Sequence, residues 1–272
     1  MDVCPSCGAQ LTGKYCSSCG QERVDPSRET VRGFVRASVA AVSPVDGRAV
    51  LSLRDLIRRP GLLTREFIAG RRQTYLPALQ LFLLCNLVFF ILSGVMGNRM
   101  FTQPLVSQTN MQIYSPLARD MVRDRMTGEG APDYRELAAR FDLVSDHYAR
   151  ALVIIMVPFI ALAVGILEYG RGRALHHVVF ALHYLSFALL FYIVEFVVFF
   201  RIGRAFGWFA PDSVFAITAF LAQAVYLAFA FRRAYGDGVI AAVAKGAVAS
   251  FAAMVTIQIY RFILFMVAIH AA

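Results

Sequence analysis

The feature that most constrains this chain is an apolar block without a charged side chain, LPALQLFLLCNLVFFILSGVM, which runs from Leu76 to Met96. A helix of about 20 residues rises ~30 Å and therefore crosses the hydrocarbon core of a bilayer. In a soluble domain, polar residues would interrupt such a block at helical or strand periods. The block therefore predicts a first membrane span over residues 76–96.

Similar apolar blocks follow in the second half of the chain, and they predict four further spans. They cover about residues 151–167, 178–200, 213–231 and 239–260. The composition agrees, because 58% of the residues are apolar and 17% are charged, against roughly 45–50% and about 25% in soluble domains. We therefore expect an all-α integral membrane helical bundle of about five transmembrane helices over residues 76–272.

Two local features modify this scheme. The polar residues 97–150 contain the turn-rich run Thr127-Gly128-Glu129-Gly130-Ala131-Pro132, and we expect an extracytoplasmic loop with one or two short helices. Pro158 lies in the second span and predicts a kink, because proline cannot donate the backbone hydrogen bond of a helix interior.

Residues 1–21 predict a small zinc ribbon. Each of two Cys-x-x-Cys-Gly knuckles can aim two sulfurs at one ion, and the following glycine permits the turn. Four protein ligands close a tetrahedral shell, so we expect a structural zinc ion that supplies folding energy. An iron–sulfur cluster, a redox pair and a disulfide pair are the alternatives. The expected ligands are Cys4, Cys7, Cys16 and Cys19, whereas Cys85, inside an apolar run, is assigned to packing.

Residues 22–75 form an arginine-rich, cytosolic segment with amphipathic helices. In the first of these helices, between Ser27 and Ala41, one face carries Val31, Phe34, Val35 and Val39, and another carries Arg28, Arg32 and Arg36. Such a helix lies on an anionic membrane surface or packs on the ends of the spans. The arginines lack interleaved aromatic residues, which argues against nucleic acid as the partner.

The segment continues with two short helices that lead into the membrane. Pro60-Gly61 is expected to break the chain between them, Gly70 to end the second, and Pro77 to begin the first span.

The positions of the arginines predict the topology. They flank the first span on its N-terminal side and lie in the links 168–177 and 232–238, and the positive-inside rule assigns all three regions to the cytosol. Thiolate ligands also persist in a reducing compartment. We therefore expect a multi-pass protein of the bacterial inner membrane with a cytoplasmic N-terminus.

The N-terminal third resembles a known family. The motif ending in Cys19-Gly20-Gln21, the Arg59-Pro60-Gly61 element and the run from Phe67 to Arg72 with Tyr75 and Pro77 are followed by several spans. This order is similar to domain-of-unknown-function family 3667, a family of uncharacterised bacterial membrane proteins. The resemblance covers mainly residues 4–90. It implies a location and an architecture, but no activity, substrate or catalytic residue.

Polar groups inside the spans form a second candidate site. A charged side chain at membrane depth costs ~2.5–3.5 kcal/mol on insertion scales, so Glu195 in the third span requires an explanation. Gln258 and Arg261 of the fifth span are expected at a similar depth and predict a cluster with Glu195. Its role is either a proton or cation relay or a contact that locks helix packing.

Other polar side chains give weaker signals. Asn86, Gln80 and Gln223 are interpreted as interhelical contacts, and His176 and His183 share a helical face without an acidic partner at ligand spacing. Lys245 is expected to extend its ammonium to the cytosolic surface.

Two functions remain open at this point. The first is an interaction, regulatory or scaffold protein that acts through the zinc ribbon, with the lipid bilayer, a cytosolic protein and a second copy of the chain as candidate partners. The second is a small transporter or channel component that uses Glu195. The sequence shows no converging carboxylates, metal-binding histidine pair or nucleophile elbow, so we do not expect an enzyme.

Overall fold

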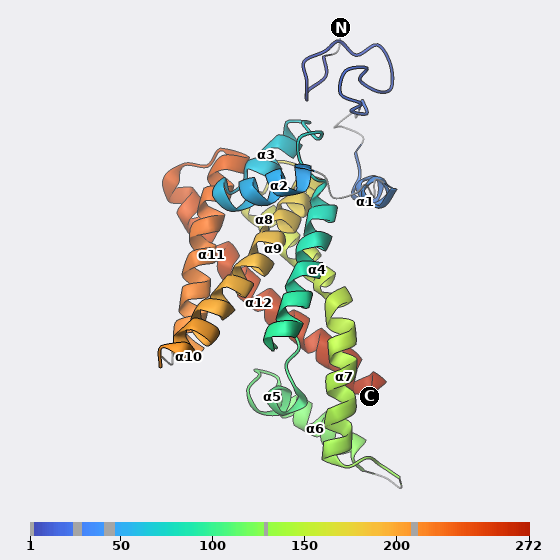
Figure 1. Cartoon of the computed structure of the whole chain (residues 1–272), viewed down its shortest axis with the longest axis vertical. Coiled ribbons are helices and arrows are strands. Elements are labelled where there is room, and N and C mark those ends of the chain that lie inside the picture. The colour runs from blue at the N-terminus through green and yellow to red at the C-terminus, as the bar shows by residue number, and fades with distance from the viewer. Residues whose placement is uncertain (1–2, 24–28, 41–46, 128–129, 208–211) are drawn as a thin grey trace. The chain divides into compact units, whose positions relative to one another are not determined.

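The computed structural model describes residues 3–23, 29–40, 47–127, 130–207 and 212–272, and beyond residues 3–23 the regular elements of this described part are helices (Figure 1). The elements, in chain order, are α1 (Val31–Ala40), α2 (Gly47–Arg58), α3 (Leu62–Ile68), α4 (Ala78–Met96), α5 (Leu105–Asn110), α6 (Ser115–Arg125), α7 (Tyr134–Leu152), η1 (Val153–Ile155), α8 (Met156–Leu167), α9 (Ala174–Phe196), η2 (Val197–Ile202), α10 (Gly203–Ala205), α11 (Asp212–Tyr235) and α12 (Val239–Ala271).

Within the described residues, five helical stretches are long and apolar enough to cross a membrane. They are Ala78–Met96, Tyr134–Leu167, Ala174–Phe199, Ser213–Tyr235 and Val239–Ala271. The expected all-α membrane bundle is therefore confirmed. Several of these helices extend beyond the apolar blocks that predicted them, since a helix can continue into water where its polar residues begin.

The second stretch shows this extension most clearly. It begins at Tyr134 inside the region expected as a loop, where the Asp133 carboxylate accepts a hydrogen bond of 2.7 Å from the Glu136 N–H and caps the helix. The short helices expected in that region are α5 and α6. The 3₁₀ turn Val153–Ile155 precedes Pro158. A proline ring clashes with the carbonyl four residues earlier, here that of Ile154, which explains the local change of helix type.

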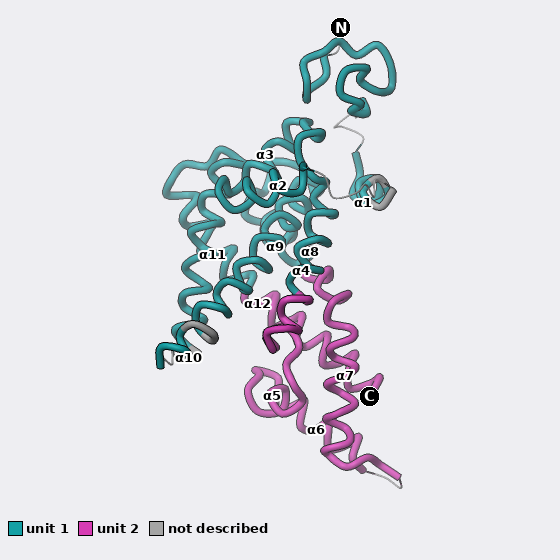
Figure 2. The backbone as a smooth tube through the Cα atoms, in the orientation of Figure 1, with its two compact units in different colours: residues 1–89, 157–253 teal, residues 90–156, 254–272 magenta. Residues whose placement is uncertain are grey.

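The chain divides into two compact units, which Figure 2 colours separately. Unit 1 comprises residues 1–89 and 157–253, and unit 2 comprises residues 90–156 and 254–272. The long helices α4 and α12 each contribute residues to both units.

In unit 1, the short helices α2 and α3 pack on the membrane helices. A buried cluster joins Leu56, Leu62 and Leu63 of these helices to Leu81 and Cys85 of α4, so the assignment of Cys85 to packing is confirmed. Polar bonds fix the contact. The Tyr226 hydroxyl of α11 donates to the Leu56 carbonyl at 3.0 Å, and the Leu76 N–H donates to the Ser52 hydroxyl at 2.9 Å.

The turn between α2 and α3 shows why glycine follows Pro60. Gly61 has φ 79°, and a Cβ added there would lie 2.4 Å from the Ala230 carbonyl oxygen of α11. Glycine is therefore needed both for the backbone conformation and for the close approach. The Arg233 guanidinium donates to the Pro60 carbonyl at 2.9 Å on the same contact. The predicted break at Pro60-Gly61 is confirmed.

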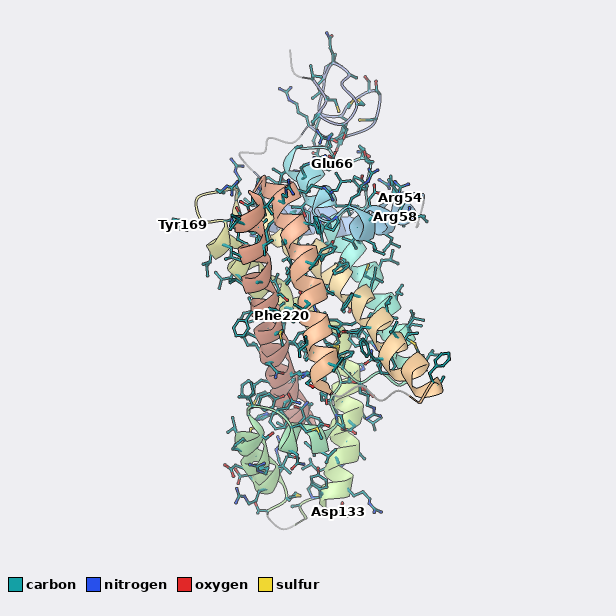
Figure 3. All side chains as sticks on the ribbon, turned by 90° about the vertical axis from the view of Figure 1, so that its left-hand side faces the viewer. Arg54, Arg58, Glu66, Asp133, Tyr169 and Phe220 are labelled. Atoms are coloured by element: carbon teal, nitrogen blue, oxygen red, sulfur yellow. The ribbon has the colours of Figure 1, made fainter. Side chains whose placement is uncertain are left out.

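The three arginine-bearing segments predicted to share a side of the membrane meet at one end of unit 1. Arg233 reaches Pro60, and Arg171, in the link after α8, donates to the Tyr235 carbonyl at 2.6 Å. In Figure 3, Arg54, Arg58, Glu66 and Tyr169 lie toward this end, whereas Phe220 lies midway along α11. These contacts show that the segments share a side. Their assignment to the cytosol stays a prediction.

Unit 2 has its own core. Leu105, Val122, Leu137, Phe141 and Phe265 are buried together, so α5, α6 and α7 pack on the last turns of α12. The Tyr260 hydroxyl donates to the Ala149 carbonyl at 3.1 Å. Unit 2 thus holds the polar segment after the first span as a packed helical structure.

The first amphipathic helix differs from its predicted pattern. Among the described side chains of α1, Phe34 and Ser38 are buried, whereas Val31 and Val35 are 37% and 42% exposed. The predicted apolar face was therefore only partly correct, because Phe34 packs edge-on against Phe67 of α3, with ring centroids 5.7 Å apart, and this contact sets the rotation of the helix. Arg28 and the Val39 side chain lie outside the described residues.

Candidate metal centre and its attachment to the membrane domain

The cysteine ribbon, residues 3–23, contains two knuckles with the same hydrogen-bond pattern. The Gly8 N–H donates to the Cys4 carbonyl at 2.9 Å, and the Gly20 N–H donates to the Cys16 carbonyl at 2.9 Å. Gly8 and Gly20 have φ 77° and 72°, a conformation that L side chains rarely adopt. The chain thus turns twice so that each pair of cysteines faces the other pair.

The four predicted cysteines come together. Their sulfurs all lie within 4.8 Å of one another, with 3.6 Å between the Sγ atoms of Cys4 and Cys19 and 3.5 Å between those of Cys7 and Cys16. A metal ion ~2.3 Å from each of four tetrahedral sulfurs would place them about 3.8 Å apart. The donor set and its spacing therefore fit a four-coordinate metal ion.

Local hydrogen bonds favour the thiolate form of one ligand. The backbone N–H groups of Cys19 and Ser18 lower the pKa of Cys16 to about 6. The pKa of Cys19 in the same knuckle is raised to about 12 by burial and by the neighbouring thiols, so Cys16 is the thiol of this knuckle that loses its proton first. With four sulfurs as ligands, the shell leaves no position for a reacting water or substrate.

The ribbon is attached to the turn that follows α3. The Gln21 amide donates to the Gly70 carbonyl at 2.8 Å, and the Arg72 N–H donates to the Gln21 side-chain oxygen at 3.2 Å. The same N–H lies 3.3 Å from the Ser6 hydroxyl, which also donates to Gln21. Gly70 has φ 78°, and a Cβ added there would lie 3.3 Å from the Pro5 ring, so the ribbon approaches this turn closely. The second short helix, α3, ends just before Gly70, as predicted. The ribbon binds to the turn that follows this helix.

Arg72 links three elements at this point. Its backbone binds the ribbon, while its guanidinium forms a two-pronged ion pair with Glu29, next to α1. The guanidinium carbon also lies 4.2 Å from the centre of the Phe67 ring, within the range of a cation–π interaction. The Arg72 side chain is only 23% exposed. One residue therefore connects the ribbon, α1 and α3.

A buried charge network at the same end of unit 1 was not predicted. The Lys245 ammonium of α12 lies 2.5 Å from a carboxylate oxygen of Glu168 and 2.9 Å from one of Asp237. Arg171 pairs with both acids. The side chains of Glu168 and Asp237 are 0% and 4% exposed. We call these four residues the basal charge network.

The prediction that Lys245 extends its ammonium to the cytosolic surface named no partner for that ammonium. Its ammonium is bound by two buried carboxylates because α12 begins two residues after Asp237 and α8 ends directly before Glu168. The sequence contained a signal for these partners, because acidic residues stand at the ends of two spans. They are Glu168 and Asp237, 77 and 8 residues from Lys245.

The pKa values of the two acids are shifted in opposite directions. Burial raises the pKa of Glu168, with the neighbouring Asp237 carboxylate adding to the effect. Burial also acts against the charged form of Asp237, but the bonds from Lys245 and Arg171 outweigh it and lower the pKa of Asp237. The network therefore holds a carboxyl group that binds a proton more readily than a free glutamate does.

The predicted intramembrane cluster is distributed over both units. In unit 1, Glu195 is 4% exposed and accepts a hydrogen bond of 2.9 Å from the Thr218 hydroxyl of α11. In unit 2, the Arg261 guanidinium donates to the Gln258 side chain at 3.2 Å and to the Met100 carbonyl at 3.0 Å. The Gln258–Arg261 contact is observed, while the link from Glu195 to Arg261 stays a prediction.

Several other polar side chains in the spans of unit 1 make interhelical bonds. The Gln223 amide donates to the Tyr192 hydroxyl at 2.8 Å and accepts from Tyr184. His183 shares a hydrogen bond of 2.9 Å with Thr64 of α3, and the Gln80 amide donates to a backbone carbonyl of α1. These bonds agree with the interpretation of scattered amides as interhelical contacts.

Comparison with known proteins gives one match. A family model described as Protein of unknown function (DUF3667) matches residues 46–90, which supports the resemblance seen in the sequence. No curated protein and no solved structure matches the chain. The matched segment contains α2, α3 and the start of α4. It therefore includes Gly61, Gly70 and Arg72, the residues that bind α11 and the ribbon.

Proposed function

We propose that this chain is a bacterial inner-membrane protein that presents a zinc-bound ribbon on the cytosolic side as a binding surface for another protein. Zinc is the proposed metal because a closed shell of four thiolates is typical of structural zinc sites. The three arginine-bearing segments meet at one end of unit 1. By the positive-inside rule, this arrangement supports a cytoplasmic N-terminus. A metal ion with four protein ligands has no open position for a substrate, so the proposed role of the ribbon is binding and not catalysis.

The observation that carries this proposal is the division of the ribbon surface. Ser6, Pro5 and Gln21 face the turn after α3. Val3 and Tyr15 remain 57% and 55% exposed. Aromatic side chains such as that of Tyr15 are enriched in protein–protein interfaces. The attached face fixes the ribbon, so the exposed face is presented in a defined orientation.

The test is affinity capture with the zinc-loaded full-length protein in lipid nanodiscs. We expect a cytosolic protein that binds the wild type and is lost with the double variant Val3→Ser/Tyr15→Ser. The matched control is Val50→Ser, because Val50 is 70% exposed on α2, outside the ribbon. Equal capture by all three proteins would contradict the proposal.

A second candidate function is supported by Glu195. One of its carboxylate oxygens, Oε2, is buried and has no hydrogen-bond partner within the described part of the chain. Intramembrane carboxylates of this kind mark ion or proton pathways in many membrane proteins. Proton flux into proteoliposomes, measured with an internal pH-sensitive dye, tests this alternative. Flux that Glu195→Gln abolishes would support it, and flux equal to that of empty liposomes would exclude proton transport.

A further inference from the structure

A cavity of about 550 Å³ lies between the ribbon, α1, the turn after α3 and the start of the first span. Its volume is within the ~300–1,000 Å³ of typical ligand sites. All of its walls belong to unit 1. None of the contacts described for the ribbon or the basal charge network explains why this space is kept.

The two ends of the cavity differ in chemistry. At one end the lining includes Ala78, the first residue of the first span, and His183. His176, near the start of α9, interacts electrostatically with Arg72 and Glu29, and His183 lies seven residues further along this helix, about 10 Å. Phe34, Leu63 and Leu76 add apolar surface. This end adjoins the start of the first span and suits a hydrocarbon group.

The opposite end is polar and bears more positive than negative charge. Arg23, Arg71 and Arg72 line it together with Glu22 and Glu29. Both acids are already paired, Glu22 with Lys14 at 3.4 Å and Glu29 with Arg72. Arg71 binds Glu66 through Nε and one terminal nitrogen, and a guanidinium has further N–H donors. This end suits an anion that accepts several hydrogen bonds.

We propose that the cavity binds one anionic phospholipid of the inner leaflet, with its phosphate at the arginine end and hydrocarbon at the Ala78 end. Arginine recognises phosphate by directional, charge-assisted hydrogen bonds. The ribbon residues Gln21, Glu22 and Arg23 form part of the wall, so the lipid contacts the ribbon as well as the spans. Lipid binding thereby stabilises the attachment of the ribbon. This inference depends on the cavity and not on the presence of a protein partner.

The test uses native mass spectrometry of the zinc-loaded full-length protein in detergent. The probes are dioleoyl phosphatidylglycerol, dioleoyl phosphatidylcholine with the same chains, and inorganic phosphate. We expect one phosphatidylglycerol adduct that survives at activation energies at which phosphatidylcholine is lost. Inorganic phosphate in millimolar excess should not displace it, because phosphate supplies no hydrocarbon.

Two variants address the two features of the cavity. Ser38→Phe adds a ring to a buried lining residue of α1, and Gln73→Glu adds a negative charge without changing size. Each should reduce retention of phosphatidylglycerol about tenfold or more, because a filled volume or a like charge excludes the lipid. The matched controls are Val50→Phe, at an exposed position of α2, and Gln103→Glu in unit 2, both outside the cavity.

The outcomes separate the possible sources of the anion. Equal retention of both lipids, or retention that neither variant changes, would overturn the proposal. Displacement by inorganic phosphate would show that the site takes a soluble anion, which also overturns it. If Ser38→Phe fails to fold, reduced retention of phosphatidylglycerol by Gln73→Glu alone would still support binding of the phosphate at the arginine end.

Discussion

Replacement of Lys245 by methionine provides the sharpest test of the basal charge network. The change removes the ammonium but keeps a side chain of similar length in α12. It leaves Glu168 and Asp237, which are 0% and 4% exposed, with Arg171 as their remaining cation. Arg171 is 47% exposed, so it compensates only in part.

The expected loss follows from the burial of the two acids. Removal of one partner from a buried ion pair typically destabilises a protein by about 3–5 kcal/mol. Because Arg171 remains and Lys245 is itself 18% exposed, we expect the lower end, ~3 kcal/mol. For a chain of this size that corresponds to a fall in Tm of about 6–12 °C.

The sign of the effect distinguishes two interpretations of Lys245. If the ammonium only reached into water, the Lys245→Met change would increase the hydrophobicity of a membrane helix and stabilise it. If the network holds α8 and α12 together, the variant is destabilised. Thermal unfolding in nanodiscs, followed by intrinsic fluorescence, measures this difference. An unchanged or higher Tm would refute our interpretation.

A rescue variant and a control complete the experiment. The triple variant Lys245→Met/Glu168→Gln/Asp237→Asn removes all three buried charges together, and replacement of a whole buried pair is often neutral. It should recover most of the lost stability. Arg171→Gln removes an exposed cation and should lower Tm much less. A triple variant as unstable as Lys245→Met would show that lost packing, and not unpaired charge, causes the effect.

The network also predicts a pH dependence. The raised pKa of Glu168 means that the folded state binds this proton more tightly, so its contribution is complete below its ordinary pKa of 4.5 and is lost as pH rises through the folded value. Asp237, whose pKa is lowered, contributes above 3.8 and loses its contribution as pH falls. Without Lys245, both acids favour protonation. The difference in Tm between wild type and variant should therefore shrink from about pH 8 to about pH 5.

Three further changes test other parts of the structure. Cys16→Ser should abolish the binding of one zinc per chain, measured by elemental analysis, and expose the ribbon to protease; retained zinc would contradict the four-sulfur site. Gly61→Ala should destabilise the protein by about 2–4 kcal/mol through backbone strain and the clash with α11, whereas Gly130→Ala, with the same φ of 79° but open space around it, should cost only about 1–2 kcal/mol. Equal Tm values for the two would refute the close approach. Arg72→Gln keeps the backbone bonds to the ribbon but removes the ion pair with Glu29, so it should loosen α1, seen as faster amide hydrogen exchange in α1 than in wild type, and an unchanged exchange rate would contradict the linking role of the Arg72 side chain.

The sequence alone determined the features that depend on local chemistry. Apolar blocks of ~20 residues have few stable structures other than membrane helices, because a bilayer leaves backbone groups no partner outside the helix. The knuckle spacing places four sulfurs around one point through turns that its own glycines permit. The break at Pro60-Gly61 follows from backbone constraints of those two residues.

Only the tertiary structure decided which distant residues meet. Lys245 reaches Glu168 across 77 positions, and Arg72 reaches Glu29 across 43. The rotation of α1 depends on the contact of Phe34 with Phe67 of α3. The hydrophobic periodicity of α1 alone cannot reveal this contact. A hydrophobic pattern indicates which face of a helix can be buried. The partner that a charged or aromatic side chain contacts is decided only when the helices pack. For the same reason, a cavity formed by four separate segments leaves no signal in any one of them.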